Sequence, residues 1–265
     1  QKLKIQENQH ELKSFLHLLL RISNNHHRCP DFNEKVFKIL LLFKSQINRI
    51  FSNDDIFNFF KGNKRNLLFL LEEGIFHIDE QIATEMIDEK YSKYKFKEYF
   101  LPELKDYIEK VKNDQAIEEI PDDFEEKRRI GENDNYICKL IRNDSVEDFI
   151  TFVNRTNFPL RTQIEPSLFE TNQFLLKNKP TLIEYSAFYG SIQIFQYLDL
   201  NQVELNPSLW LYVIHGKNAE MVHILEERGV KLTPDYYEKC IEESIKCHHN
   251  EFARYIKDNF DDNQI

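Results

Sequence analysis

The chain has 265 residues, of which 41% are apolar and 13% aromatic, so a sizeable core can form and wholesale disorder is disfavoured. Its net charge of −10 argues against a general nucleic-acid binder, because phosphate contacts need a concentrated positive face. With 6 glycines and 8 prolines, it lacks the regular turn signals of an all-β protein.

The N-terminal part reads as one helix after another. Apolar residues recur at helical spacing, and Pro102 is expected to kink or restart the last of these helices. We expect residues 1–112 to form a helical region that continues or caps the remaining fold. The predicted helices cover 12–22, 32–43, 56–60, 65–74, 80–91 and 96–111.

The composition shifts over residues 113–135. This stretch is rich in Asp and Glu and includes one proline and one glycine. We interpret it as an acidic linker or solvated loop between two regions. The helical pattern resumes at Tyr136 and continues through 142–153 and 167–177, and we assign residues 136–265 to a second region.

A repeat is the most informative pattern in the second region. Pro180, Pro207 and Pro234 follow one another at intervals of 27 residues, and each precedes a short apolar helix. Proline suits a helix start, where its fixed φ fits and its missing N–H is not needed. After a break, each short helix is followed by a second one: SIQIFQYL, NAEMVHILEE and NEFARYIKDNF.

This layout resembles the ankyrin repeat, whose pattern is roughly TPLHxAAxxGHxEIVxxLLxxGA. TLIEYSAFYGSIQIFQYL (181–198) matches it, with Ser186 and Ala187 as the small pair and Gly190 as the inter-helix glycine. Residues 208–230 match next, and 250–256 match the second-helix element again. The whole chain is similar to a family of Asn/Lys-rich protist proteins in which degenerate ankyrin repeats accompany a domain of unknown function.

The sequence also departs from the ankyrin pattern. Lys217 and then His248 stand where the inter-helix glycine belongs, and the period is 27 residues instead of about 33. Eight residues separate Leu198 from Pro207, which leaves too little room for a full β-hairpin finger between repeats. If the protein binds a partner, we therefore expect its inner helices to make most of the contacts.

The resemblance implies an all-α fold, a solenoid of antiparallel helix pairs with shortened inter-repeat loops. It implies a non-catalytic protein–protein interaction module, an ankyrin-like scaffold or adaptor, with no cofactor. The two residues before the inter-helix position would face a concave groove. Phe188 could instead pack under the preceding helix, leaving only Tyr189 exposed. The candidate partner-binding residues are Phe188, Tyr189, His215, Lys246, Arg142, Asn143 and, in the N-terminal region, Lys61.

Two Cys/His groups raise the alternative of a metalloprotein: His26, His27 and Cys29, and Cys247, His248 and His249. Cysteine and histidine are zinc ligands, but neither group has the paired spacing of a structural zinc site. Cys138 and Cys240 fall on apolar helix faces, where a cysteine is usually a small core residue rather than a nucleophile. We therefore expect neither a metal site nor a catalytic residue.

The segment YSKYKFKEYF (91–100) interleaves lysines with aromatic residues, a pattern that can stack with and neutralise nucleic acid. The alternative is an amphipathic helix with a solvated lysine face. The four cysteines and the lack of a secretion signal indicate a reduced, cytoplasmic protein, and no apolar run approaches the length of about 20 residues of a membrane span. We expect a monomer with a protein partner.

Overall fold

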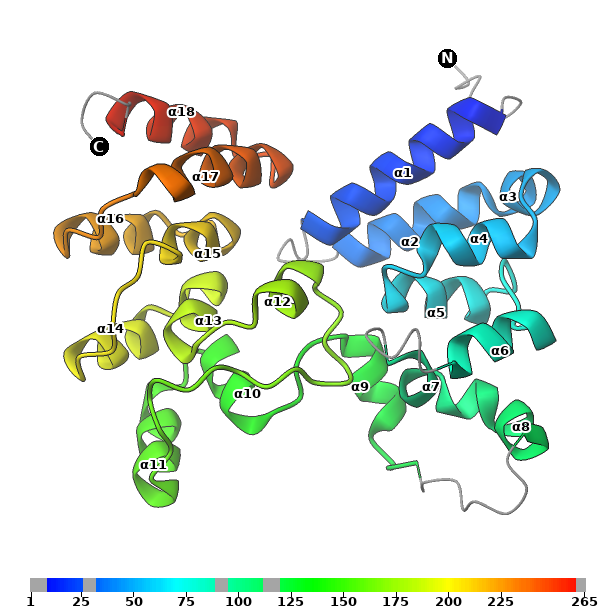
Figure 1. Cartoon of the computed structure of the whole chain (residues 1–265), viewed down its shortest axis with the longest axis horizontal. Helices are drawn as coiled ribbons and strands as arrows, with labels where there is room; N and C mark the ends of the chain where they lie inside the picture. Colours follow the sequence, from blue (N-terminus) through cyan, green and yellow to red (C-terminus); the bar gives the residue numbers. More distant parts are fainter. Residues whose placement is uncertain (1–8, 26–31, 89–94, 112–119, 261–265) are drawn as a thin grey trace. The chain divides into compact units, whose positions relative to one another are not determined.

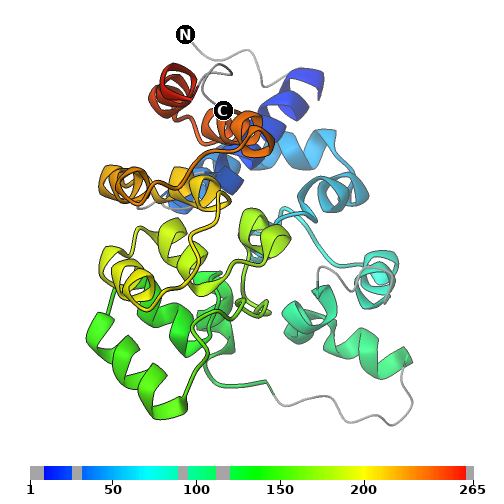
Figure 2. The same cartoon turned by 60° about the vertical axis from the view of Figure 1, so that its left-hand side comes forward.

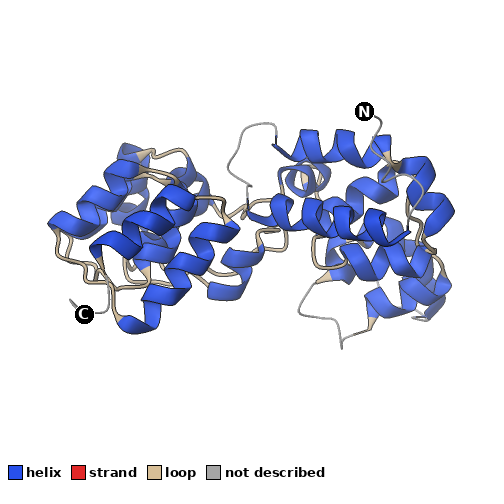
Figure 3. Cartoon of the chain, turned by 90° about the horizontal axis from the view of Figure 1, so that it is seen from above, coloured by secondary structure: helices blue, strands red, loops and turns tan. Residues whose placement is uncertain are grey.

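The computed structural model describes residues 9–25, 32–88, 95–111 and 120–260, except for the Val111 side chain (Figure 1). Within these residues the chain forms 18 α-helices and no strand, which confirms the predicted all-α class. Figure 3 shows helices joined by loops throughout. One isolated antiparallel bridge joins Gln163 and Thr181. Among the described helices, none has the length and apolar character to cross a membrane.

The chain divides into two compact units. Among the described residues, the first unit contains 9–25, 32–88, 95–111, 120–133 and 167–176. The second unit contains 134–166 and 177–260. The division near residue 133 lies close to the end of the predicted linker. The return of 167–176 to the first unit was not predicted.

The first unit is built on an apolar core from nine helices. Two of them, α3 and α9, were not predicted, and the predicted helix 96–111 is broken at Phe100, just before Pro102. Residues 89–91 of the predicted helix 80–91 lie outside the described part of the chain. The helices are α1 (Gln9–Asn25), α2 (Phe32–Leu42), α3 (Lys44–Ile50), α4 (Asn53–Phe60), α5 (Lys64–Glu72), α6 (Glu80–Ile87), α7 (Phe96–Tyr99), α8 (Leu101–Val111) and α9 (Phe124–Ile130).

The prediction of a solvated linker is wrong for α9. Phe124 and Arg128 are buried, although the surrounding sequence is highly charged. Arg128 donates two 2.8 Å hydrogen bonds to the Glu103 carboxylate, and it also binds Glu125. Its Nη1 donates to the Tyr99 carbonyl oxygen at 3.0 Å. Because bidentate carboxylate pairing compensates the desolvation of a guanidinium, the charges that suggested a loop hold this helix in the core.

Residues 167–176 are held in the first unit by polar contacts. Lys64 Nζ donates to the Leu168 carbonyl oxygen at 2.7 Å, and Thr171 Oγ1 donates to the Gly131 carbonyl oxygen at 2.8 Å. The Gln173 side chain donates to the Gly62 carbonyl oxygen at 2.5 Å. Gly131 has a φ of +70°, and a Cβ there would lie 3.0 Å from Thr171 Oγ1. The left-handed φ therefore favours glycine at position 131, and any side chain there would also press against that of Thr171.

Lys64 is the buried cation of this contact. Its ammonium lies 4.6 Å from the centre of the Tyr99 ring. Burial lowers the pKa of Lys64 from 10.5 to about 8, although the carboxylate of Glu170 opposes the shift. A lowered folded pKa means that the unfolded chain binds the proton more tightly, so stability rises as the pH increases from about 8 to 10.5.

We expect Lys64→Met to remove this increase in stability between about pH 8 and 10.5. Urea unfolding of both proteins, followed by circular dichroism across that pH range, measures it. The difference between the two curves of unfolding free energy against pH removes the contributions of the other titrating groups, which both proteins share. The difference should grow towards alkaline pH by on the order of 1–3 kcal/mol in favour of the wild type. Parallel curves would show that Lys64 keeps an ordinary pKa.

The second unit contains the repeats. The predicted helix 167–177 is shorter and later than expected, because residues 167–172 are held in extended and turn conformations against the first unit. Helix α12 (Gln173–Asn178) begins in residues of the first unit. The helices that follow residue 134 in the second unit are α10 (Tyr136–Arg142), α11 (Val146–Thr156), α13 (Leu182–Tyr189), α14 (Ile192–Leu200), α15 (Leu209–Gly216), α16 (Ala219–Glu227), α17 (Pro234–Lys246) and α18 (Asn250–Asn259).

Four of these helices pack one after another, and each of them has a second helix packed against it. Helix α10 packs against α13, α13 against α15, and α15 against α17. Each is followed in the chain by a helix that packs against it: α11, α14, α16 and α18. In Figure 2 the layers follow one another from green through yellow to red. We call α10, α13, α15 and α17 the inner helices.

The turns after the inner helices share one backbone conformation. Asp144, Gly190, Lys217 and His248 all have left-handed φ angles, of 50°, 67°, 50° and 55°. These include the three inter-helix positions predicted from the repeat. Lys217 and His248 adopt a conformation that favours glycine, and such positions cost about 1 kcal/mol or more for other residues. The topology of the repeat therefore overrides the local preference.

The inner helices α13 and α15 approach closely at Gly216. A Cβ at this position would lie 2.5 Å from the Ala187 carbonyl oxygen. The neighbouring atom is backbone, so it cannot move aside as a side chain would. The absence of a side chain at Gly216 sets the distance between these two helices.

We expect Gly216→Ala to lower the free energy of unfolding by about 1–3 kcal/mol, because the added methyl group must push two helices apart. Urea unfolding followed by fluorescence of Trp210, the single tryptophan and a fully buried residue of α15, reports on this unit. Gly62→Ala, followed by circular dichroism because Gly62 belongs to the first unit, is the control, since no atom lies within 4 Å of the added Cβ. An equal, small effect of both changes would contradict the close approach.

Candidate functional site

The structure brings five of the seven candidate partner-binding residues into one row of contacting side chains. They project from successive inner helices. Two further residues, one tyrosine and one glutamate, complete the row. We call it the inner-helix row. Its members are Arg142, Tyr185, Phe188, Tyr189, His215, Glu243 and Lys246.

The row begins at Arg142, at the end of α10. Its Nη1 donates a 2.9 Å hydrogen bond to the hydroxyl oxygen of Tyr185 on α13. The guanidinium also lies 5.9 Å from the centre of the Tyr189 ring, within cation–π range. The two tyrosine rings are 4.7 Å apart. A cation is thus held against two aromatic rings of the next inner helix.

Aromatic stacking carries the row from α13 to α15. The Phe188 ring lies 5.1 Å from that of Tyr189 and 5.0 Å from the imidazole of His215. The Phe188 and His215 rings are inclined by only 28°, a stacked arrangement. Ring pairs of this kind add about 0.5–1.5 kcal/mol beyond their buried area.

A hydrogen bond between His215 and Glu243 carries the row from α15 to α17, and an ion pair within α17 extends it to Lys246. His215 Nε2 lies 2.9 Å from Glu243 Oε1, and Lys246 Nζ lies 3.3 Å from Glu243 Oε2. Burial alone would raise the pKa of the Glu243 carboxyl. The hydrogen bond and charge of His215, together with Lys246, instead hold this pKa below its ordinary value. Glu243 is therefore ionised at neutral pH.

The exposure of the candidate residues differs from the prediction. Phe188 is 0% exposed, His215 2% and Tyr189 8%, so the expectation of an exposed aromatic pair is wrong. Even the alternative, in which only Phe188 is buried, underestimates the packing. Both aromatics lie within the row, because α13 is apolar around almost its whole circumference.

The polar candidates remain accessible to different degrees. Lys246 and Asn143 are exposed, and Arg142 is partly buried by Tyr185 and Tyr189. Lys61 belongs to the first unit, where it forms a 3.3 Å ion pair with Glu85. It is therefore not a member of the inner-helix row.

Phe188→Ala should lower the free energy of unfolding by about 3–5 kcal/mol, since it removes a fully buried ring and leaves a cavity. Asn143→Ala changes an exposed side chain at the end of another inner helix and should change stability by less than about 0.5 kcal/mol. Urea unfolding followed by Trp210 fluorescence compares the two. A Phe188→Ala variant as stable as the wild type would restore the predicted exposed surface.

The two Cys/His groups noted in the sequence do not appear as groups among the described residues. His26, His27 and Cys29 lie outside the described residues. His248 is exposed at its turn, whereas Cys247 is buried and faces the other way, towards His215. Its Sγ lies 3.7 Å from Nδ1 and 3.9 Å from Nε2 of that imidazole. The His215–Cys247 contact was missed because 32 residues separate them in the sequence.

The buried thiols do not have the properties of nucleophiles. Cys138, Cys240 and Cys247 are buried and form no disulfide. Burial raises the pKa of both Cys240 and Cys247 to about 12, with the Glu243 charge adding to the effect. A catalytic cysteine needs access to substrate and a lowered pKa. Cys240 and Cys247 are therefore neutral core groups.

The described part of the segment 91–100 does not form a stacking surface. Phe96, Tyr99 and Phe100 are buried in the core of the first unit, with at most 1% exposure. Residues 91–94 lie outside the described part of the chain. These three buried rings are not available to stack with nucleic-acid bases.

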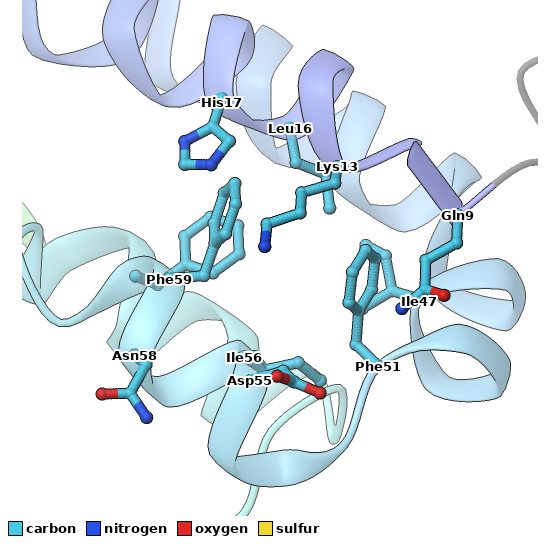
Figure 4. Close-up of a pocket in the computed structure, with 11 residues that line it drawn as sticks. Gln9, Lys13, Leu16, His17, Ile47, Phe51, Asp55, Ile56, Asn58 and Phe59 are labelled. Carbon is cyan, nitrogen blue, oxygen red and sulfur yellow. The ribbon is translucent and has the colours of Figure 1, made fainter. Parts of the chain in front are cut away.

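A pocket of about 310 Å³ opens in the first unit between α1 and the α3–α4 region (Figure 4). Its apolar wall includes Phe51 and Phe59, and the Phe59 ring lies 4.1 Å from that of His17. Figure 4 shows the Lys13 ammonium between these aromatic groups. Lys13 and His17 are exposed, so the pocket is a surface cleft rather than an enclosed cavity. No pattern in the sequence predicted this pocket.

Comparisons with known proteins do not assign a family or a function to the chain. No family model, no curated protein and no solved structure matches the chain.

Proposed function

We propose that the chain is a non-catalytic protein-interaction module with degenerate ankyrin-like repeats, arranged as a solenoid of antiparallel helix pairs. The observation that supports this proposal is the serial packing of the inner helices α10, α13, α15 and α17. Each ends in the same left-handed turn. Units that bury their apolar faces only against neighbours are characteristic of repeat proteins, and such arrays commonly bind other proteins.

The contact surface of the proposed module lies at the polar ends of the inner-helix row, together with Asn143, which follows Arg142 in the chain. Lys246 and Asn143 are exposed, and Arg142 is partly exposed. The aromatic centre of the row supports these ends by fixing the spacing between helices. A partner that binds here would meet positive and amide groups, so we propose an acidic or hydrogen-bond-accepting protein surface.

A non-catalytic role agrees with the chemistry of the described residues. The cysteines of the second unit are buried, and the raised pKa values of Cys240 and Cys247 keep them as thiols. His215 and Glu243 are paired with each other within the row. We further propose that the protein acts as a monomer in the cytoplasm, as the composition suggests.

Affinity capture from the native cell, read by mass spectrometry, tests this function. We expect wild-type protein to recover a specific protein partner, and Asn143→Ala/Lys246→Ala to recover severalfold less because two exposed contacts are lost. Lys38→Ala is the matched control, since Lys38 is an exposed lysine of the first unit. Equal recovery by all three proteins would place the contact elsewhere, and no recovery by wild type would contradict the function.

A further inference from the structure

Three potential metal ligands of different chemistry converge on one point between α15 and α17. They are His215, Glu243 and Cys247, whose donor atoms all lie within 4.8 Å of one another. Glu243 lies on α17 and Cys247 follows four residues later as the C-cap of that helix, so both side chains lie on the same side of it. His215 faces them from the neighbouring inner helix.

We propose that His215, Glu243 and Cys247 bind one divalent transition-metal ion, with Zn²⁺ as the best chemical match. Imidazole nitrogen, thiolate sulfur and carboxylate oxygen are the three ligand types that proteins offer to zinc. Hard cations such as Mg²⁺ and Ca²⁺ prefer oxygen ligands, so a set of one nitrogen, one sulfur and one oxygen disfavours them.

The distances between the donor atoms are close to those of a coordination shell. Zinc bonds of about 2.0–2.3 Å in tetrahedral geometry place neighbouring donors roughly 3.4–3.6 Å apart. His215 Nε2 lies 2.9 Å from Glu243 Oε1 and 3.9 Å from Cys247 Sγ. An ion between these atoms would separate the hydrogen-bonded pair by about half an ångström and draw the sulfur inward.

Binding requires one local reorientation. Cys247 Sγ is almost equidistant from the two ring nitrogens, at 3.7 and 3.9 Å, so it lies over the imidazole and not along a nitrogen lone pair. The ring must turn to direct Nε2 at an ion held by the other two ligands. Phe188, stacked on His215, provides a flat apolar wall for this movement.

The surroundings suit a site with three protein ligands and one open position. The His215 side chain is fully buried and Cys247 is 0% exposed, whereas the Glu243 side chain is 13% exposed. The carboxylate side of the site therefore offers access for an ion and for a water ligand. An ionised carboxylate and a thiolate together balance the two charges of the ion, which lowers the cost of burying it.

Proton release couples this site to pH. Cysteine binds a metal ion as the thiolate, so the buried Cys247 thiol must lose its proton as the ion binds. The affinity for the metal should consequently increase with pH.

Titration of the full-length, reduced protein with Co²⁺ tests the proposal, because Co²⁺ replaces Zn²⁺ and is visible by absorption. We expect one equivalent to produce visible d–d bands and a near-ultraviolet thiolate-to-cobalt band. Zn²⁺ should displace both, and should raise the unfolding temperature monitored by Trp210 fluorescence. Lack of the thiolate band in folded wild-type protein would overturn the proposal.

Two matched cysteine variants assign the ligand. Cys247→Ser should abolish the thiolate band, whereas Cys240→Ser should keep it, since Cys240 is equally buried on the same helix but outside the group. Cys29→Ser should also keep the band. If Cys29→Ser removes it and Cys247→Ser does not, the N-terminal cysteine holds the ion and the proposed site is wrong. Glu243→Gln provides a second test by weakening binding without removing the thiol.

Discussion

The second unit depends on the close approach of α13 and α15. Gly216 lets the backbones of these helices meet where a methyl group would lie 2.5 Å from the Ala187 carbonyl oxygen. At this separation Phe188 stacks on His215, and His215 in turn reaches Glu243 on α17. One steric constraint therefore positions the row of side chains that links the inner helices. Tight packing at this point also explains why the adjacent aromatic residues Phe188 and Tyr189 lie in the core and not on the surface.

The first unit depends on a different interaction, the burial of paired charge. Arg128 is buried and binds the carboxylates of Glu103 and Glu125 at the edge of the core, and Lys64 is buried where it donates to the backbone of the segment 167–176. Such groups are costly to bury unless each is hydrogen-bonded, so they specify where the returning segment docks. The two units thus use distinct physical means, close apolar packing in one and satisfied polar burial in the other.

The repeat could be predicted from sequence because it rests on local signals. The spacing of Pro180, Pro207 and Pro234 located the inner helices, and the left-handed φ of Lys217 and His248 confirms the inter-helix positions. Burial at the row could not be predicted, because α13 is apolar on nearly every side and its pattern identifies no exposed face. Helix α9 was missed because its charges suggested solvent, while the partner that buries Arg128 lies 25 residues away. The group of His215, Glu243 and Cys247 could not be predicted either, because its members come together only when α15 packs against α17.

A double-mutant cycle between Phe188 and His215 tests most directly whether the inner helices form one continuous row. Unfolding free energies of the two single alanine variants, the double variant and the wild type would be measured in urea with chelator present, using Trp210 fluorescence. The stacked contact predicts a coupling energy of about 0.5–1.5 kcal/mol between the two positions. Additive effects, within about 0.3 kcal/mol, would contradict direct packing of α13 on α15 through these rings.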